Sequence, residues 1–544
     1  MKSSLSRHKL RLIAGVAVLI LVIAAFLNDR TDYDFVSGEE ARQRLDSYKW
    51  HEEPQKIRLV GDPHDAYLTR RSWIGEAERK IDLATFLWRD DASSRVLFDD
   101  LLEACERGVE VRILADGIFY LRKTARVKAM AQAHENLEIR VFNPLGDRLA
   151  SLDAQSLDDF GWQLDNANHR FHIKLFTIDD KKTLLGGRNI GDPYFGFADD
   201  YNFIDMEVAI QGSVVEQAET IFQEFWDSPL TVPVLELKDV AAATAEPRSG
   251  PDPIPERYAK GPVEEEWREV NRMAIWADSP QTIDDVSGYQ PELLADRLAA
   301  LLGTVEKDLL VSTPYLVFSE RSHALLRRLR SEKEGLQVRF LSNSLAASDN
   351  WQTYSAFQAQ LRSMITEYRL LIHLKKPSSL MEWAGSDKGF ACLHSKVWVA
   401  DDRWSAIGSF NWDPRSEIFN SEVMAVFDDP GLSAELREIL EPLQKPDNAW
   451  VVAERELPIG LEQIDGLTHL FNDLSSELTG IRTWSLRNTA CFEFVGEEVM
   501  SPYEEGFHQH YRSVGSFPNT GISEKKRIYS VLMEPLSELL KPAL

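Results

Sequence analysis

Apolar runs of strand and helix length alternate along this chain, and the same order of runs occurs twice. In the first half the pattern predicts a strand, a helix and a second strand at residues 81–88, 94–107 and 109–114. In the second half it predicts the same three elements at residues 309–317, 319–330 and 336–341. Strands that alternate with helices are typical of α/β proteins. We therefore expect an α/β fold whose second half repeats the first.

A group of polar residues also occurs twice, each time beside an apolar run. Its first copy is His172, Lys174, Asp179, Gly186 and Asn189. Its second copy is His394, Lys396, Asp401, Gly408 and Asn411. Each residue of the second copy lies 222 positions after its counterpart in the first. Five matched residue types at one offset indicate an internal duplication.

The residues between these polar positions predict a hairpin in each copy. Apolar residues after the histidine predict a strand at 173–178 and at 397–399, and the Asp-Asp dipeptide that follows predicts a polar turn. A second strand ends in a Gly-Gly or Gly-Ser pair, where a ligand can approach the backbone closely. Residues two apart on a strand point to one face, so the histidine and lysine of each copy should project together.

Each copy thus supplies a titratable imidazole, a fixed cation and an amide donor. Two copies that face each other would surround a phosphate with two lysines and two asparagines. One histidine could attack phosphorus while the other protonates the leaving oxygen, because the unperturbed pKa of imidazole lies near neutral pH. Ionisable groups that cluster in register favour a catalytic site over buried structural residues.

The pattern His-x-Lys, four residues, Asp, six residues and Gly-Gly/Ser-x-Asn resembles the HKD motif of the phospholipase D superfamily. The resemblance extends from about Ile57 to Phe427. Three segments, 186–192 (GGRNIGD), 343–347 (NSLAA) and 408–415 (GSFNWDPR), together with Asn143-Pro144, resemble bacterial cardiolipin synthases of the ClsC-like type. The resemblance implies two α/β/α domains related by a pseudo-twofold axis, with both motifs at their interface.

The resemblance also implies roles for the residues of both motifs. His172 would be the nucleophile that forms a phosphohistidine, and His394 the general acid and later the base. Four residues would hold the phosphate oxygens, namely Lys174, Lys396, Asn189 and Asn411. Asp179 and Asp401 would brace the turns. The lysines supply the positive charge, and no His or carboxylate cluster has metal-ligand spacing, so we expect neither a metal nor another cofactor.

Acidic residues downstream of each motif orient the imidazoles in this family. The positions that match here are Glu207 and Glu422, with Asp205 as a rival to Glu207. Glu207 and Glu422 lie 215 positions apart, which predicts that the intervening loop is seven residues shorter in the second copy. A carboxylate on one imidazole nitrogen fixes the tautomer that leaves the other nitrogen free to attack.

Charge restricts the classes of ligand. The chain has 544 residues and a formal net charge of −26. This acidity argues against nucleic acid as a partner, because binding to its backbone depends on Lys and Arg. The anionic leaflet of a membrane would also repel such a body, so an enzyme of anionic lipids would need a tether.

The N-terminus supplies a candidate tether. Four basic residues precede an uncharged apolar run at 12–27, which is short for a membrane span and long for the core of a signal peptide. A signal anchor is favoured over a cleaved signal peptide, because Phe26 and Leu27 leave no small-x-small cleavage site. The positive-inside rule then puts the catalytic body on the extracytoplasmic side, which is the periplasm in a Gram-negative host.

The sequence divides into six segments on this interpretation. They are an anchor or signal peptide (1–30), a connector (31–56), a first phospholipase D-like domain (57–237), a linker (238–270), a second such domain (271–443) and a small C-terminal extension (444–544). The apolar tail at 528–544 is expected either to lie in a membrane interface or to pack back on the body.

The most direct functional hypothesis is phosphatidyl transfer between phospholipids that forms cardiolipin. The expected substrate is phosphatidylglycerol, with phosphatidylethanolamine as a further candidate donor. A phospholipase D that uses water as the acceptor is the nearest alternative, because the motifs do not record how dry the cleft is. A non-catalytic membrane scaffold with the same fold is the alternative from a different class.

Overall fold

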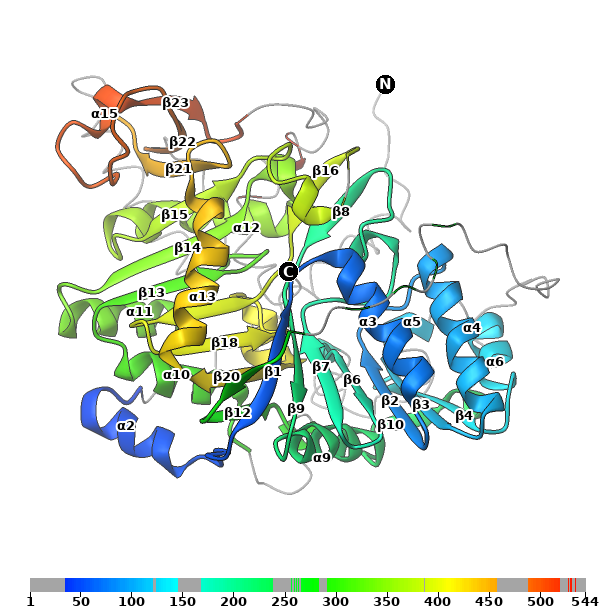
Figure 1. Ribbon diagram of the computed structural model, residues 1–544. Helices are drawn as coiled ribbons and strands as arrows, with labels where there is room; N and C mark the ends of the chain where they lie inside the picture. Colours follow the sequence, from blue (N-terminus) through cyan, green and yellow to red (C-terminus); the bar gives the residue numbers. More distant parts are fainter. Residues whose placement is uncertain are drawn as a thin grey trace, which may run out of the picture.

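The computed structural model describes residues 35–120, 124–144, 168–237, 266–282, 291–385, 387–456 and 488–518, with a few single residues besides. Two large mixed sheets lie at its centre (Figure 1). In spatial order the first sheet consists of β10 (Thr231–Pro233), β4 (Leu137–Phe142), β3 (Glu110–Asp116), β2 (Lys80–Thr85), β6 (Leu175–Ile178), β7 (Lys182–Gly186), β9 (Glu207–Gln211), β1 (Gln55–Val60) and β11 (Arg268–Val270).

Part of the second sheet repeats this order when it is followed in the opposite direction. The second sheet consists of β12 (Met273–Ala277), β20 (Val423–Asp428), β18 (Trp404–Gly408), β17 (Val397–Ala400), β13 (Asp308–Ser312), β14 (Gln337–Asn343), β15 (Leu371–Lys375), β21 (Ala449–Glu454), β22 (Thr489–Phe494) and β23 (Tyr511–Gly515). The strands from β15 to β12 match those from β4 to β1 in order, and β2–β3 and β13–β14 are the matching parallel pairs. The predicted α/β class and the duplication are therefore confirmed.

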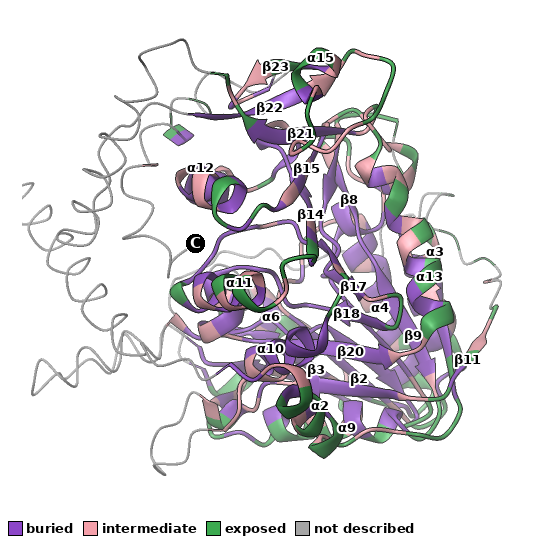
Figure 2. Cartoon of the chain, turned by 90° about the vertical axis from the view of Figure 1, so that its left-hand side faces the viewer, coloured by how far each residue is buried: buried purple, intermediate pink, exposed green. Residues whose placement is uncertain are grey.

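The two sheets pack face to face, and each has its own helices on the outside. On the first sheet these are α3 (Pro63–Glu76), α4 (Ala92–Glu106), the short α5 (Gly117–Tyr120) and α6 (Thr124–Ala131); on the second they are α10 (Leu294–Thr304), α11 (Glu320–Glu332) and α12 (Trp351–Thr366). Apolar residues of both sheets, with α9 (Val215–Trp226) and α13 (Pro430–Leu440), form the core between them. Figure 2 shows the strands largely buried and the outer helices partly exposed.

This layering explains why the strands are continuous apolar runs. On β17, Val397 and Val399 point into the core between the sheets, whereas Trp398 and Ala400 point into the core beneath the outer helices. Both faces of such a strand are buried, so every position is apolar and the strand shows no alternation with polar residues.

The two predicted hairpins are present as β6–β7 and β17–β18. Asp179 and Asp401 turn them with φ values of 51° and 53°, a left-handed conformation that Asp tolerates better than most residues. Each carboxylate accepts three backbone N–H groups, from residues 78–80 in the first copy and 306–308 in the second. These two aspartates therefore brace the turns, as expected.

Part of the segment expected as a connector is a docked helix. Helix α2 (Gly38–Ser47) packs on α10, and Ala41 and Leu45 join the outer core of the second half. Gly303 makes this contact possible, because a Cβ there would lie 2.3 Å from the carbonyl oxygen of Val36. The segment from Phe35 onward thus belongs with the second half, although the first half follows it in sequence.

The described part of the C-terminal extension continues the second sheet. Strand β21 pairs with β15, β22 pairs with β21, and β23 pairs with β22, with α15 (Phe507–His510) between the last two. The expected apolar run at 12–27, most of the linker at 238–270 and most of the tail at 528–544 lie outside the described residues. Within the described ranges, none of the helices is both long and apolar enough to cross a bilayer.

Candidate active site

Two short strand pairs cross from one half of the molecule to the other. Strand β5 (Arg170–Phe171) runs parallel to β19 (Asn420–Ser421), and β8 (Tyr201–Ile204) runs parallel to β16 (Phe390–Leu393). Figure 1 shows β8 and β16 side by side between the two halves. The backbone N–H of His172 continues the first pair by donating to Ser421 (2.9 Å), and that of His394 continues the second by donating to Ile204 (2.7 Å). Each motif histidine is thus held by the opposite half.

Each of these histidines also binds a carboxylate of the opposite half. His172 Nδ1 lies 2.8 Å from Glu422 Oε2, and His394 Nδ1 lies 2.6 Å from Asp205 Oδ2. Both histidines are largely buried, with 9% and 5% of their surfaces exposed. A carboxylate that accepts the Nδ1 proton fixes the tautomer with an unprotonated Nε2. The reciprocal exchange is the pattern that a twofold relation between the halves requires.

The expected role of Glu207 is wrong, and Asp205 occupies that position instead. Glu207 lies opposite Gly186 on the sheet, and Met424 lies opposite Gly408 in the same way. The counterpart of Glu207 is therefore Met424, and the counterpart of Asp205 is Glu422. The true offset of the acids is 217, so the loop in the second copy is five residues shorter, not seven.

Glu207 has a different partner. Its two carboxylate oxygens accept from Nη1 and Nη2 of Arg70 at 2.9 and 2.6 Å, and Arg188 Nη1 lies 3.4 Å from it. All three side chains are buried within the first half. Glu207 thus neutralises buried guanidinium groups behind the site and does not contact either motif histidine.

The motif lysines complete one shared site. Lys174 Nζ donates to the carbonyl oxygen of His172 (2.7 Å), and Lys396 Nζ donates to that of His394 (2.5 Å). Burial lowers the pKa of both lysines, and the charge of Lys396 lowers the pKa of Lys174 further. The pKa of His172 responds to both lysine charges, so the two motifs act within a single electrostatic environment.

The two motif asparagines are not equivalent. Asn189 is used by the scaffold, because its Oδ1 accepts from the N–H of Leu87 (3.1 Å) and its Nδ2 donates to the hydroxyl of Tyr194 (2.9 Å). Asn411 is buried, and its Oδ1 has no hydrogen-bond partner among the described residues. Contact of either amide with a phosphate stays a prediction.

Aromatic rings flank both imidazoles. Phe86 packs edge-on against His172, with ring centroids 5.1 Å apart. Tyr194, which ends the 3-10 turn η1 (Asp192–Tyr194), and Phe203 of β8 flank His394 at 5.3 and 4.7 Å. Such apolar walls fix the planes of the rings and limit the access of water.

Burial lowers the pKa of both histidines, but the surrounding charges differ. At His172 the charges of Lys174, Lys396 and Arg415 lower the pKa further, well below its ordinary value. All three are cations, and each of them disfavours a proton on this ring. Burial and these three cations therefore favour the neutral form of His172.

His394 lies between opposite charges. Burial and the charge of Lys396 lower its pKa to about 4, whereas the carboxylates of Asp205 and Asp349 raise it. Asp205 itself has a lowered pKa, because His394 and Lys396 outweigh the effect of its burial. The two carboxylates thus offset part of the effect that burial and Lys396 have on the pKa of His394.

Similarity to a known protein family extends over both halves of the molecule that form this site. The family model described as "Cardiolipin synthase, PLD-like domain" matches residues 71–226 and 298–443, one match in each half. The chain belongs to the cardiolipin synthase family. As a member of this family it is an enzyme of the phospholipase D superfamily.

Three members of the cardiolipin synthase family or of its superfamily illustrate the extent of the similarity. Cardiolipin synthase C of Escherichia coli (strain K12) is 30% identical over 394 residues, which cover 68% of this chain and 80% of that protein. Cardiolipin synthase 1 of Bacillus anthracis is 24% identical over 359 residues, covering 65% and 59%. The structure of phosphatidylserine synthase from Haemophilus influenzae Rd KW20 shares the fold, with a TM-score of 0.54 at 15% identity over 80% of this chain and 98% of that one.

Several residues of this cardiolipin synthase family site were not apparent in the sequence. Phe86 and Asp349 come from loops and Tyr194 from the 3-10 turn η1, and none of the three belongs to the repeated residues of the motifs. Ser409 was visible only as the small residue after Gly408, yet its hydroxyl donates to Glu422 Oε2 (2.5 Å). In the sequence, the only indication of this contact is that Ser409 stands where the first copy has Gly187.

The charge at Arg415 provides a test of the state of His172. Arg415 begins the π-helical turn η8 (Arg415–Phe419) and donates to Asn168 at 2.8 and 2.9 Å. In Arg415→Gln the pKa of His172 rises, because one of the cations that lower it is lost. If neutral His172 is required, the acidic limb of a plot of kcat/KM against pH moves to higher pH.

The control is Arg403→Gln, which removes a surface guanidinium that pairs with Asp428. Its acidic limb should coincide with that of the unchanged protein. A limb that stays in place in Arg415→Gln, or moves to lower pH, contradicts the electrostatic role of Arg415.

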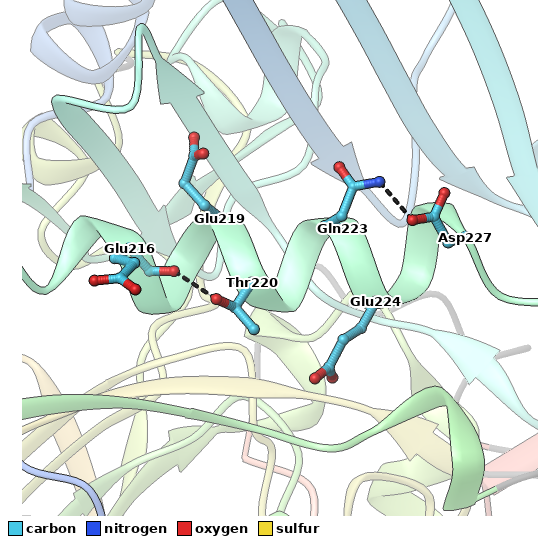
Figure 3. A pocket seen from close by; sticks show the side chains of 6 residues that line it. All are labelled: Glu216, Glu219, Thr220, Gln223, Glu224 and Asp227. Carbon is cyan, nitrogen blue, oxygen red and sulfur yellow. Dashed lines mark hydrogen bonds between the residues drawn. The ribbon is translucent and has the colours of Figure 1, made fainter.

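A separate surface hollow along α9 does not belong to this site. Figure 3 shows the side chains that line it, namely Glu216, Glu219, Thr220, Gln223, Glu224 and Asp227. Four of them carry carboxyl groups, and no residue of either motif takes part. Such a surface repels phosphate, so it is not a candidate for the phosphate-binding centre.

Proposed function

We propose that this protein transfers a phosphatidyl group from one phospholipid to another and thereby forms cardiolipin. The observation that carries the proposal is the pair of motif histidines, each bound at Nδ1 by a carboxylate of the opposite half, in one centre with two buried lysines. This arrangement assigns the carboxylates to the two Nδ1 atoms and supplies two cations for one phosphodiester. Relatives that carry the name cardiolipin synthase support the same reaction.

In the first step His172 Nε2 attacks the phosphorus of the donor lipid. A P–N bond forms, the bond from phosphorus to the head-group oxygen breaks, and His394 gives its proton to that oxygen. The charges around the rings support this assignment, because three cations lower the pKa of His172, whereas the carboxylates of Asp205 and Asp349 offset part of the lowering at His394. A bound phosphodiester adds negative charge, which raises the pKa of His394 toward the range of a general acid.

In the second step a hydroxyl of phosphatidylglycerol attacks the phosphohistidine. His394 takes the proton of that hydroxyl, a P–O bond forms, and the P–N bond to His172 breaks. Two molecules of phosphatidylglycerol thus give cardiolipin and glycerol, whereas phosphatidylethanolamine as donor gives cardiolipin and ethanolamine. Lys174 and Lys396 would stabilise the charge on the non-bridging oxygens in both steps.

The test is a turnover assay on the full-length protein in mixed micelles. Phosphatidylglycerol is supplied alone and then with phosphatidylethanolamine, and the products are identified by mass spectrometry. The proposal is supported if the unchanged protein forms cardiolipin and the His172→Asn variant does not. Phosphatidic acid as the main product would show a hydrolase instead, and a folded protein without any turnover would show a scaffold.

We also propose that residues 12–27 anchor the protein and that its catalytic body lies on the extracytoplasmic side of the membrane. The basic residues before this apolar run support that orientation, and a tether would hold an acidic body at an anionic surface. Without residues 12–27 the protein should partition into the soluble fraction and still act on micellar lipid. Mature protein that begins near Asn28 would show a cleaved signal peptide and overturn the anchor.

A further inference from the structure

A carboxylate lies beside the strand that carries His394. Asp349 is exposed and precedes α12, and the hydroxyl of Tyr315 donates toward both of its oxygens, at 3.0 and 3.1 Å. Cys392 Sγ lies 3.8 Å from Asp349 Oδ1. Because Cys392 is two residues before His394 and the charge of Asp349 acts on the His394 ring, the carboxylate lies on the His394 side of the centre.

The charge of Asp349 reaches the catalytic groups on that side. It offsets part of the lowering of the pKa of His394 and of Lys396, and it contributes to the raised pKa of Tyr194, whose ring flanks His394. At His172 a charge from outside the His-x-Lys pairs is the cation of Arg415, in the π-helical turn η8. Asp349 and Arg415 thus place one carboxylate near His394 and one guanidinium near His172.

This difference was not inherited from the duplication. Thr313 Oγ donates to the carbonyl oxygen of Tyr315, and Thr85 Oγ donates in the same way to that of Leu87, both at 2.9 Å. The two turns match, so Leu87 occupies the position of Tyr315. Leucine has no hydroxyl to hold a carboxylate, and the first half cannot form the same pair at this turn.

We propose that Asp349 and Tyr315 form the subsite for the head-group alcohol. The inference rests on the proposed function, in which the group that attacks and the group that leaves lie on opposite sides of phosphorus. The leaving oxygen then lies next to His394, and the rest of the head group extends toward Asp349. The acceptor hydroxyl enters by the same side in the second step.

The chemistry of the pair selects alcohols that carry a second hydrogen-bond donor. An ionised carboxylate has about four acceptor positions, and Tyr315 and Cys392 leave some of them open toward solvent. The carboxylate repels the phosphate but accepts a hydrogen bond from a second hydroxyl, as in glycerol, or from an ammonium group, as in ethanolamine. Tyr315 is the positioning residue that holds the carboxylate in place.

The experiment measures head-group release in single turnovers, with the full-length protein in excess over lipid. The three donors are phosphatidylglycerol, phosphatidylethanolamine and phosphatidylpropanol, and the last has no second donor group. For the unchanged protein we expect release of glycerol or ethanolamine to be faster than release of propanol. In Asp349→Ala this preference should fall by about tenfold or more, the effect of losing a hydrogen bond to a charged group.

Further variants separate the two head groups and the two residues. Asp349→Asn keeps an acceptor oxygen without the charge, so it should lose preference for ethanolamine more than for glycerol. Tyr315→Phe should lose part of both preferences. Asp447→Ala removes another exposed carboxylate of the second half and should keep the full preference.

Equal effects of Asp349→Ala on all three donors would overturn the subsite, because they would show that the charge acts only on His394. Equal rates for the three donors in the unchanged protein would overturn it as well. Both results leave the proposed function intact. Failure of the unchanged protein to release any head group would instead count against the proposed function.

Discussion

Asparagine in place of His172 eliminates every covalent phosphatidyl adduct, whereas asparagine in place of His394 leaves an adduct that forms on His172 and then persists. The nucleophile is essential for the P–N bond, so no donor rescues its loss. The general acid is dispensable when the leaving group is a weak base, but the base that activates the acceptor is then missing. Turnover of natural lipids should fall by about 10²–10⁴-fold or more in both variants.

The measurement uses a phosphatidyl ester of p-nitrophenol and peptide mapping of the trapped protein by mass spectrometry. The double variant, with both histidines replaced, is the control for adventitious labelling. An adduct on His394 would reverse the assignment of the two histidines, and the superfamily reaction would still hold. A complete absence of adducts would indicate direct displacement by the acceptor.

Asp205→Asn and Glu207→Gln should fail in different ways, although the two residues are only two positions apart. Asp205 accepts the proton of His394 Nδ1, so the amide removes the group that sets the tautomer. We expect kcat to fall by about 10²–10⁴-fold with little change in thermal unfolding. Glu207 pairs with the buried Arg70, so its loss should destabilise the fold by about 3–5 kcal/mol and leave kcat of the folded fraction near normal.

Thermal unfolding and kcat, both measured on each purified variant, separate the two outcomes. Glu422→Gln is the matched comparison, because Glu422 binds His172 in the same way, and its kcat should fall with that of Asp205→Asn. A Glu207→Gln protein of normal stability and greatly reduced kcat would restore Glu207 to the catalytic site.

The sequence was sufficient for the fold class, the duplication and the residues of both motifs. The positions of the strands could be predicted because each sheet is buried on both faces, which makes its strands unbroken apolar runs. The turns at Asp179 and Asp401 were equally clear, because a pair of left-handed residues in a hairpin demands a small set of residue types. Local patterns of this kind depend only on neighbouring residues.

The acidic partners depend on contacts that no local pattern records. Glu207 matched Glu422 in residue type, and only the pairing of Gly186 with Glu207 and of Gly408 with Met424 shows that the match is displaced by two residues. The exchange of partners between the halves was likewise invisible, because the motif itself is the same whether an acid comes from its own half or the other. Asp349 lies on a loop whose neighbours only the fold brings together.

The strand pairs that cross between the halves also set the order in which the molecule must assemble. The contacts His172–Glu422 and His394–Asp205 join residues 250 and 189 positions apart, so each closes a very long loop. Such contacts form late, after the local hairpins and parallel strand pairs of each half, because the entropy of closure must be overcome first. Catalysis should therefore report the docking of the two halves, and we expect mild denaturant to abolish it before helices and sheets are lost.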